Sequence, residues 1–142
     1  MSATSQPIAT LEQNKKLLVR WFEEVWNHGN RDVIHQLLAP ECVIHDGTNT
    51  MNGAAEFERF YDGLRSRFSE VRVSSVFAIA EGDLACVHWF SQVKEAATGK
   101  TAHVTGTSIV RVKDGRFIEG WQNWDHASLA AQLSGTAPTP LY

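Results

Sequence analysis

A long β-hairpin signal in the last third of the chain constrains the fold more than any other feature. Two segments with strand-like patterns, Thr101–Lys113 and Arg116–Trp124, flank the turn Lys113-Asp114-Gly115-Arg116. Asp-Gly between two such segments favours a tight hairpin, because both central residues of the turn must tolerate positive φ. The second strand leads into Trp121-Gln122-Asn123-Trp124-Asp125-His126 and then a helix. We expect the end of this hairpin to form one wall of any functional site.

Length and composition indicate one ordinary globular domain. The chain has 142 residues, and we expect a single domain with an ordered core from about residue 10 to residue 134 and frayed ends. A net charge of −3 without a run of Lys or Arg argues against nucleic-acid binding. No apolar run is long enough to span a membrane, and residues 1–10 lack a signal-peptide pattern. Cys42 and Cys86 fit a reducing compartment as free thiols, so we expect a soluble, cytoplasmic protein.

The spacing of apolar residues predicts three helices before the main sheet. The first begins after Thr10, a residue type suited to an N-cap, and ends at Asn27-His28-Gly29-Asn30, where Gly29 can adopt the left-handed conformation. A second, shorter helix follows and ends near Pro40. The third begins at Gly53 and presents Phe and Leu residues on one face.

Four consecutive strands after the third helix predict an antiparallel sheet. The first two are Val71–Ala80 and Leu84–Lys94, and the hairpin supplies the others. An isolated strand, Cys42–Asp46, precedes them and is followed by a polar loop at residues 47–52. Along Thr101–Lys113, the small and mostly apolar side chains share one face, which is the expected inner face. Gly106 on that face predicts a bend or a bulge.

This α-α-β-α-β-β-β-β-α order resembles the nuclear transport factor 2-like superfamily. Three motifs carry the resemblance: the Asn27-His28-Gly29-Asn30 break, the strand end Ile44-His45-Asp46-Gly47, and the hairpin that ends near Trp121. The chain most resembles the SnoaL-like polyketide cyclase family, from about Leu11 to Leu133. The resemblance implies an α+β fold, a cystatin-like α+β barrel. In that fold, helices wrap a curved antiparallel sheet into a cone that is usually dimeric through its outer sheet face. Activity is not implied, because this superfamily includes isomerases, cyclases, dehydratases, epoxide hydrolases and binding proteins.

Two carboxylates are candidates for a general acid or base. Asp46 matches the position where the resemblance to ketosteroid isomerase places the proton-shuttling carboxylate of that enzyme, and the mouth of an apolar cone suits a base. Asp125 follows Trp121 as the acid/base Asp of SnoaL-like cyclases follows a Trp. Both positions also have structural interpretations, because Asp46 can cap a turn before Gly47 and Asp125 can cap the last helix. The sequence does not choose between them.

An oxyanion hole of the ketosteroid isomerase kind is not expected. That enzyme stabilises its enolate with a Tyr on the first helix and a protonated carboxylic acid on a central strand. The matching residues here are Phe22 and Ser108. Phe22 cannot donate a hydrogen bond and Ser108 is a weaker donor than a carboxylic acid, which argues against steroid isomerisation.

The expected pocket lining combines aromatic rings with one amide. Trp89, Gln122 and Trp124 are the strongest candidates, and Phe22 and Ser108 are also expected in the lining, although indoles in a small sheet are more often core residues. Strand alternation sends the side chains of His45 and Asp46 to opposite faces, so one of them is expected to line the cone unless a bulge intervenes. The sequence has no metal-ligand spacing, glycine-rich phosphate loop or nucleophile elbow, so no metal or cofactor is expected.

Two functions are compatible with this sequence. The first is an enzyme that binds a small apolar, oxygenated organic molecule and applies cofactor-free acid/base chemistry, as an isomerase, cyclase or dehydratase. The second is a non-catalytic ligand-binding or dimerisation module on the same fold. A homodimer through the outer sheet face is expected, because Leu84–Val93 is apolar on both faces and Ile109 lies on the outer face with several Thr residues.

Overall fold

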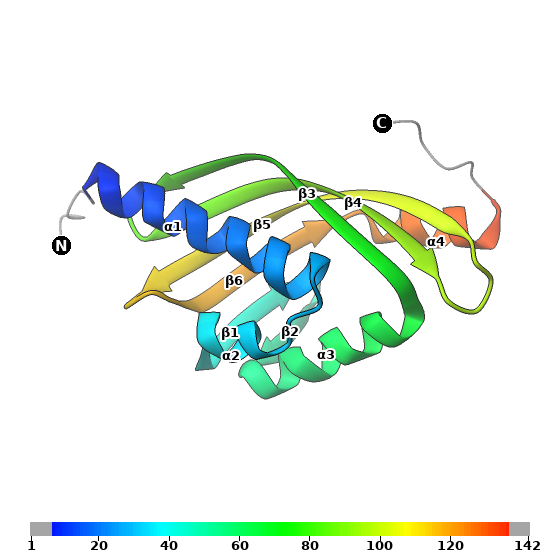
Figure 1. Cartoon of the computed structure of the whole chain (residues 1–142), viewed down its shortest axis with the longest axis horizontal. Helices are drawn as coiled ribbons and strands as arrows, with labels where there is room; N and C mark the ends of the chain where they lie inside the picture. Colours follow the sequence, from blue (N-terminus) through cyan, green and yellow to red (C-terminus); the bar gives the residue numbers. More distant parts are fainter. Residues whose placement is uncertain (1–6, 137–142) are drawn as a thin grey trace.

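A curved, six-stranded sheet wrapped on its concave side by helices forms the protein, as the computed structural model shows (Figure 1). The structure describes residues 7–136, and the outermost residues at both ends of the chain lie outside this range. The strand order is β2-β1-β6-β5-β4-β3, and the α+β cone fold expected from the sequence is confirmed. The strands are β1 (Leu38–Asp46), β2 (Asn49–Asn52), β3 (Phe68–Glu81), β4 (Leu84–Glu95), β5 (Thr101–Lys113) and β6 (Arg116–Trp124).

Pairing within the sheet is antiparallel between all neighbouring strands except β1 and β6, which are parallel. The long strands β3 to β6 follow one another through short turns, as predicted. The parallel pair joins the N-terminal third of the chain to the last strand, so that Asp46 lies beside Gln122. This long-range contact has no local sequence signal.

The helices cover the inner face of the sheet and close one end of the cone (Figure 1). The segment predicted as one helix after Thr10 is two, and its N-cap is Pro7, whose carbonyl accepts hydrogen bonds from the Thr10 and Leu11 amides. The second part is a π-helix, a rare form with wider turns. The helices are α1 (Ile8–Arg20), the π-helix η1 (Trp21–Asn27), α2 (Asp32–Leu37), α3 (Ala54–Arg67) and α4 (His126–Ser134).

Two hydrophobic clusters fill the space between the helices and the sheet. The larger one joins α1, η1 and α3 to the sheet, and Val25, Phe57, Val87 and Phe117 are among its most buried members. The smaller one lies under α4, which packs its Leu129 on the ends of β3 to β5. Burying aliphatic and aromatic side chains in this way stabilises the cone by about 1.5–3 kcal/mol for each fully buried residue.

Further local predictions were wrong in whole or in part, for identifiable reasons. Residues 47–52 were predicted as a loop but include strand β2, whose mostly polar side chains at the sheet edge give no hydrophobic alternation. Pro40 lies inside β1, at an exposed position, and α2 ends earlier at Leu37. Of the two alternatives predicted at Gly106, the bulge is wrong, because pairing between β4 and β5 is continuous through this residue and an irregularity lies between Arg111 and Val112 instead.

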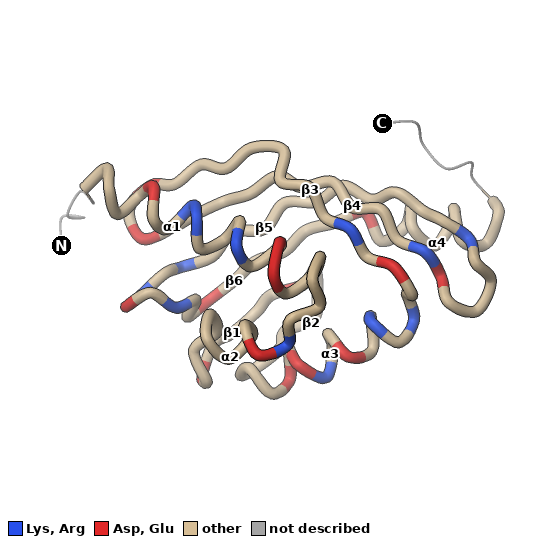
Figure 2. The backbone as a smooth tube through the Cα atoms, viewed as in Figure 1, with Lys and Arg blue, Asp and Glu red and all other residues tan. Residues whose placement is uncertain are grey.

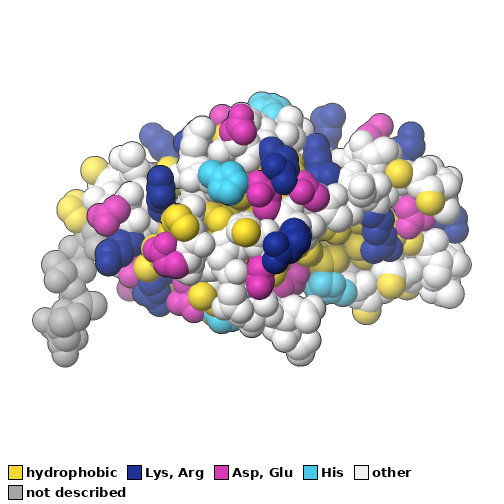
Figure 3. Space-filling model, turned by 90° about the horizontal axis from the view of Figure 1, so that it is seen from below, with side chains coloured by type: hydrophobic (Ala, Val, Ile, Leu, Met, Phe, Trp, Pro, Cys, Tyr) yellow, Lys and Arg dark blue, Asp and Glu magenta, His cyan; other side chains and the backbone are white. Residues whose placement is uncertain are grey.

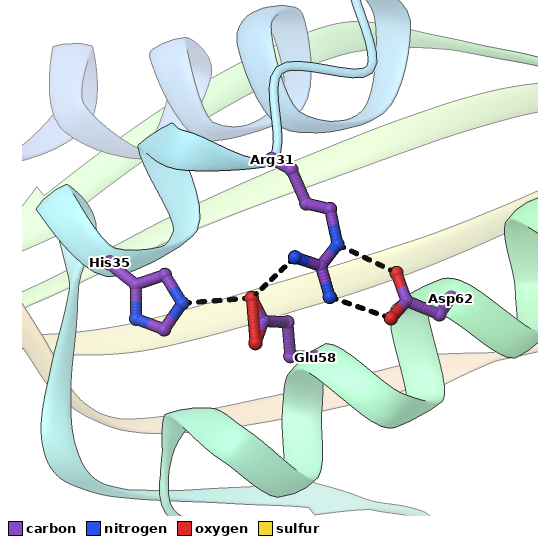
Figure 4. Close-up of polar contacts among 4 residues, drawn as sticks. All are labelled: Arg31, His35, Glu58 and Asp62. Atoms are coloured by element: carbon purple, nitrogen blue, oxygen red, sulfur yellow. Dashed lines mark hydrogen bonds and ion pairs between the residues drawn. The ribbon is translucent and has the colours of Figure 1, made fainter.

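A polar cluster on the surface connects α2 to α3 (Figure 4). The Arg31 guanidinium donates to both carboxylate oxygens of Asp62, at 2.9 and 2.7 Å, and its third nitrogen lies 3.0 Å from Glu58. His35 Nε2 lies 2.8 Å from the same Glu58 oxygen. The hydrogen bonds from Arg31 lower the pKa of Asp62. This cluster helps to hold α3 in place, and α3 forms one wall of the cavity described below.

Charged side chains of both signs are interspersed over the molecule. Figure 2 shows acidic and basic residues following one another along α3 and β3. On the face seen in Figure 3, Lys and Arg side chains lie beside Asp and Glu, with hydrophobic side chains visible between them.

Candidate functional site

A cavity of about 90 Å³ lies between the inner face of the sheet and the helices η1, α3 and α4. This volume is several times the roughly 10–15 Å³ that one water molecule requires. Aliphatic side chains and six aromatic ones form most of the lining, and the polar lining residues are Ser91, Ser108 and Gln122. The aromatic lining residues are Phe22, Trp26, Phe60, Phe68, Trp89 and Trp124.

The π-helix η1 supplies one aromatic wall. It presents Phe22 and Trp26, four residues apart, to the cavity. Hydrogen bonds to α3 and β3 hold it in place. Buried Tyr61 donates its hydroxyl to the Val25 carbonyl at 2.8 Å, and burial raises the pKa of Tyr61, which keeps this donor protonated. The Asn27 side chain bonds both the N–H and the C=O of Val73 in β3, at 2.6 and 2.8 Å.

A row of polar side chains crosses the inner face of the sheet. Asp46 of β1 is paired with Gln122 of β6, and Gln122 is paired with Ser108 of β5. Residues paired in this way have side chains on the same face, one strand spacing apart. Ser108 accepts a hydrogen bond of 3.0 Å from Trp89 Nε1. Among residues 7–136, the Gln122 side chain has no hydrogen-bond partner, so its amide can orient a ligand.

Asp46 is a buried carboxylate with unused hydrogen-bonding capacity. Its side chain is 7% exposed, and its Oδ1 atom has no hydrogen-bond partner among the described residues. His126 Nε2 lies 3.4 Å from this oxygen, which is within the range of an ion pair but lacks hydrogen-bond geometry. The His126 ring stacks on Trp124, which lines the cavity. A buried acceptor without a donor is uncommon in folded proteins and marks a candidate functional group.

Asp125 has a structural partner in the same region. Its Oδ1 accepts a hydrogen bond from the Ser128 amide at 2.9 Å, which makes it the N-cap of α4. The side chain is exposed and does not line the cavity. The capping interpretation of Asp125 is therefore present in the structure.

His45, expected among the pocket residues, lies on the opposite face of the sheet. Its Nε2 is 2.8 Å from Glu119 Oε2, and its ring stacks on Trp121 with centroids 5.6 Å apart. The reason is strand alternation: Asp46, the next residue in β1, points to the inner face, so His45 points outward. The other predicted pocket residues, Phe22, Trp89, Ser108, Gln122 and Trp124, all line the cavity.

Sequence reasoning missed several lining residues and the neighbour of Asp46. Trp26 and Phe60 lie on predicted apolar helix faces, so the spacing of Trp26 from Phe22 was an available signal. His126 had no such signal, because its proximity to Asp46 depends on the parallel pairing of β1 with β6.

Among residues 7–136, no group of three or more His, Cys, Asp or Glu side chains could hold a metal ion. No helix in that range is long and apolar enough to cross a membrane.

Comparison with sequence families gives one match over most of the chain. The model for the SnoaL-like domain matches residues 18–120. No curated protein sequence matches the chain significantly.

Solved structures share the fold at low sequence identity. A candidate SnoaL-like polyketide cyclase from Jannaschia sp. CCS1 is 22% identical with a TM-score of 0.82, over 94% of this chain and 98% of that one. IdmH, a candidate polyketide cyclase from Streptomyces antibioticus, is 22% identical with a TM-score of 0.77, over 86% and 99%. An LEH-like epoxide hydrolase from M. tuberculosis is 12% identical with a TM-score of 0.75, over 89% and 94%. At these identities the likeness establishes the fold, not the reaction.

Proposed function

Because the chain belongs to the SnoaL-like domain family, we propose that it binds a small apolar, oxygenated organic molecule in the cavity and moves a proton on it without a cofactor. The aromatic lining supports binding of an apolar ring, and the polar row supports orientation of its oxygen. One observation carries the catalytic part of the proposal. Asp46 is buried beside Gln122 and has an oxygen that no described donor satisfies.

The chemistry within reach of a carboxylate is proton transfer next to a carbonyl. The Asp46 carboxylate would take a proton from the carbon adjacent to the ligand carbonyl, and the C–H electron pair would form a C=C bond while the carbonyl oxygen becomes an enolate oxygen. Return of the proton to another carbon completes an isomerisation. Attack of the enolate carbon on a second carbonyl gives cyclisation, and loss of a β-hydroxyl group as water gives dehydration. His126, with its side chain 54% exposed, lies 3.4 Å from Asp46 at the border with solvent.

Deuterium exchange of a simple ketone tests the proposed base without knowledge of the natural substrate. In D2O, the protein should speed the loss of the α-proton NMR signal of 1-indanone above the rate in buffer. Asp46→Asn should reduce the protein-dependent rate by roughly 10²–10⁴-fold, or to the buffer rate. Asp114→Asn is the matched control, because Asp114 is an exposed carboxylate in the turn between β5 and β6 and does not line the cavity. Its exchange rate should equal that of the unaltered protein.

A non-catalytic binding module on the same fold is the second candidate function. The observation that favours it is that the cavity lining, within the described residues, includes no carboxylate. Quenching of tryptophan fluorescence by 1-indanone measures binding independently of exchange. Binding without any exchange above buffer would replace the enzyme by this second function.

A second copy of the chain is the proposed protein partner. The outer face of the sheet carries Phe77 and Ile79 of β3, each more than half exposed. In the register, Ile79 continues through Cys86 and Ile109 to Trp121, which forms a partly apolar row across four strands. A second copy packed on this face would bury the row.

A further inference from the structure

The hydrogen bond between Trp89 and Ser108 lies inside the cavity, where it has a use beyond packing. We propose that these two residues form a carbonyl-binding subsite: the Trp89 N–H donates to Ser108 Oγ, and the Ser108 O–H donates to the oxygen of an apolar ketone or of its enolate. This inference rests on the proposed function and narrows its ligand class. It assigns Ser108 as the ligand contact and Trp89 as a positioning residue that acts through Ser108.

The direction of the bond follows from the chemistry of the two groups. An indole N–H can only donate, whereas a hydroxyl has one donor and two acceptor positions. Trp89 therefore donates, and Ser108 Oγ accepts at 3.0 Å. Within residues 7–136, Ser108 makes no other hydrogen bond, although it is only 7% exposed. Its O–H proton is thus a donor without an acceptor in an apolar wall, and such a group favours a ligand that supplies an acceptor.

The bond from Trp89 also makes Ser108 a better donor. A hydroxyl that accepts a hydrogen bond is polarised, and the bond that it donates is strengthened by an estimated 10–30% in condensed phases. The effect increases with the negative charge on the acceptor, so an enolate oxygen gains more than a ketone oxygen. The Trp89–Ser108 pair therefore stabilises an enolate oxygen more strongly than Ser108 alone would.

Gly106 allows the indole to reach this position. It is paired with Trp89 in the register of β4 and β5, and it lies two residues before Ser108 on the same face. A Cβ atom at Gly106 would lie 2.3 Å from Cζ2 and 2.7 Å from Cη2 of the Trp89 ring. Phe22 packs against the same ring with centroids 6.2 Å apart. The indole is therefore held between Phe22 and the bare backbone of Gly106, which fixes where its N–H points.

The subsite also orients the ligand relative to Asp46. Ser108 and Asp46 are two strands apart in one row, with Gln122 between them. At about 4.7–4.9 Å between neighbouring strands, their backbones are roughly 9–10 Å apart. A ketone with its oxygen on Ser108 and its ring along this row would present its adjacent carbon toward the carboxylate. An apolar ketone of one or two rings matches this arrangement.

A matched pair of ligands tests the subsite. 1-Indanone and indane differ by the carbonyl alone, so the ratio of their affinities isolates its interaction from ring burial. Ser108→Ala should lower the ratio of indanone to indane affinity by about two- to tenfold relative to the unaltered protein, which is the effect of one net hydrogen bond. Trp89→Phe, which keeps a ring but removes the N–H, should lower the ratio by a smaller factor.

Isotope-edited infrared spectroscopy of bound 1-indanone gives a readout that a purely structural role would not change. A donated hydrogen bond lowers the carbonyl stretching frequency. We expect a lowered frequency in the unaltered protein, a value near that in an apolar solvent in Ser108→Ala, and an intermediate value in Trp89→Phe. Thr107→Ala is the control, because Thr107 is the adjacent residue of β5 on the outer face. It should keep both the affinity ratio and the frequency.

The outcomes separate the subsite from the function on which it rests. If both ligands bind but neither ratio nor frequency depends on Ser108, the subsite is refuted while the proposed cavity function stands. If only Trp89→Phe is without effect, the role of Trp89 is refuted. If neither ligand binds the unaltered protein, both proposals fail. Should Ser108→Ala not fold, as judged by circular dichroism, Ser108→Cys keeps the volume with a much weaker donor and must show the same losses.

Discussion

Replacing Gly106 by alanine tests whether the inner face of β5 is built around the Trp89 indole. A methyl group at this position would lie 2.3 and 2.7 Å from two ring atoms of Trp89 and 2.8 Å from the Cβ atom of Trp124. All three distances are shorter than real Cβ contacts. The ring cannot simply rotate away, because Phe22 packs on it and its N–H is bonded to Ser108.

The expected loss of stability combines three contributions. Overpacking of a well-filled site costs about 1–3 kcal/mol. Loss of the Trp89–Ser108 hydrogen bond costs about 0.5–1.5 kcal/mol. Against these, alanine in a strand is favoured over glycine by about 0.5–1 kcal/mol, because glycine loses more backbone entropy on folding. Overpacking is the largest contribution, so we expect Gly106→Ala to lower the free energy of unfolding by about 0.5–4 kcal/mol.

Gly120→Ala is the matched control for this prediction. Gly120 is also a buried glycine on the inner face, one strand away in β6, but its nearest contacts to an added Cβ are 3.6 Å or longer. That distance is ordinary van der Waals contact, so Gly120→Ala should be neutral or slightly stabilising. Urea unfolding followed by circular dichroism measures both variants. If Gly106→Ala costs no more than Gly120→Ala, the indole does not occupy the position that we assign to it.

Two further predictions concern the last helix and the outer face. Asp125→Ala should lower the free energy of unfolding by about 0.5–2 kcal/mol through loss of the cap on Ser128, whereas Asp125→Asn should leave it nearly unchanged. Loss of ketone exchange in a stable Asp125→Asn variant would give this carboxylate a chemical role. For the outer face, sedimentation should show a homodimer at roughly tens of micromolar protein. Phe77→Asp should shift it toward monomer, because it places a charge in an apolar interface, and a monomeric unaltered protein would contradict the proposal.

Much of the C-terminal half could be predicted because its signals are local. The Asp-Gly turn and the alternation around it gave the bounds of β5 and β6 as the structure has them. Alternation also identified the inner face of β5, where Ala102, Val104, Ser108 and Val110 are buried. Asp125 was recognised as a possible cap from its position before a helix, and the Ser128 amide donates to it. Each of these depends on residues within a few positions of one another.

The sequence predicted only part of the position of the candidate base, Asp46. Alternation placed His45 and Asp46 on opposite faces, but it could not say which face was inner. The parallel pairing of β1 with β6 decided it, by joining residues about 75 positions apart. The same pairing brings His126 within 3.4 Å of Asp46, which no spacing in the sequence indicates.

The sequence by itself determined the fold class, the hairpin and part of the aromatic lining, because these follow from the turn and from patterns of apolar residues. Only the tertiary structure decided how the polar groups of the cavity are arranged. Gly106 was interpreted as a bend or a bulge, and only the packing shows that its lack of a side chain makes room for the Trp89 ring. Hydrogen bonds such as that from Trp89 to Ser108 depend on ring orientations set by packing from several elements at once, and local patterns carry no information about them.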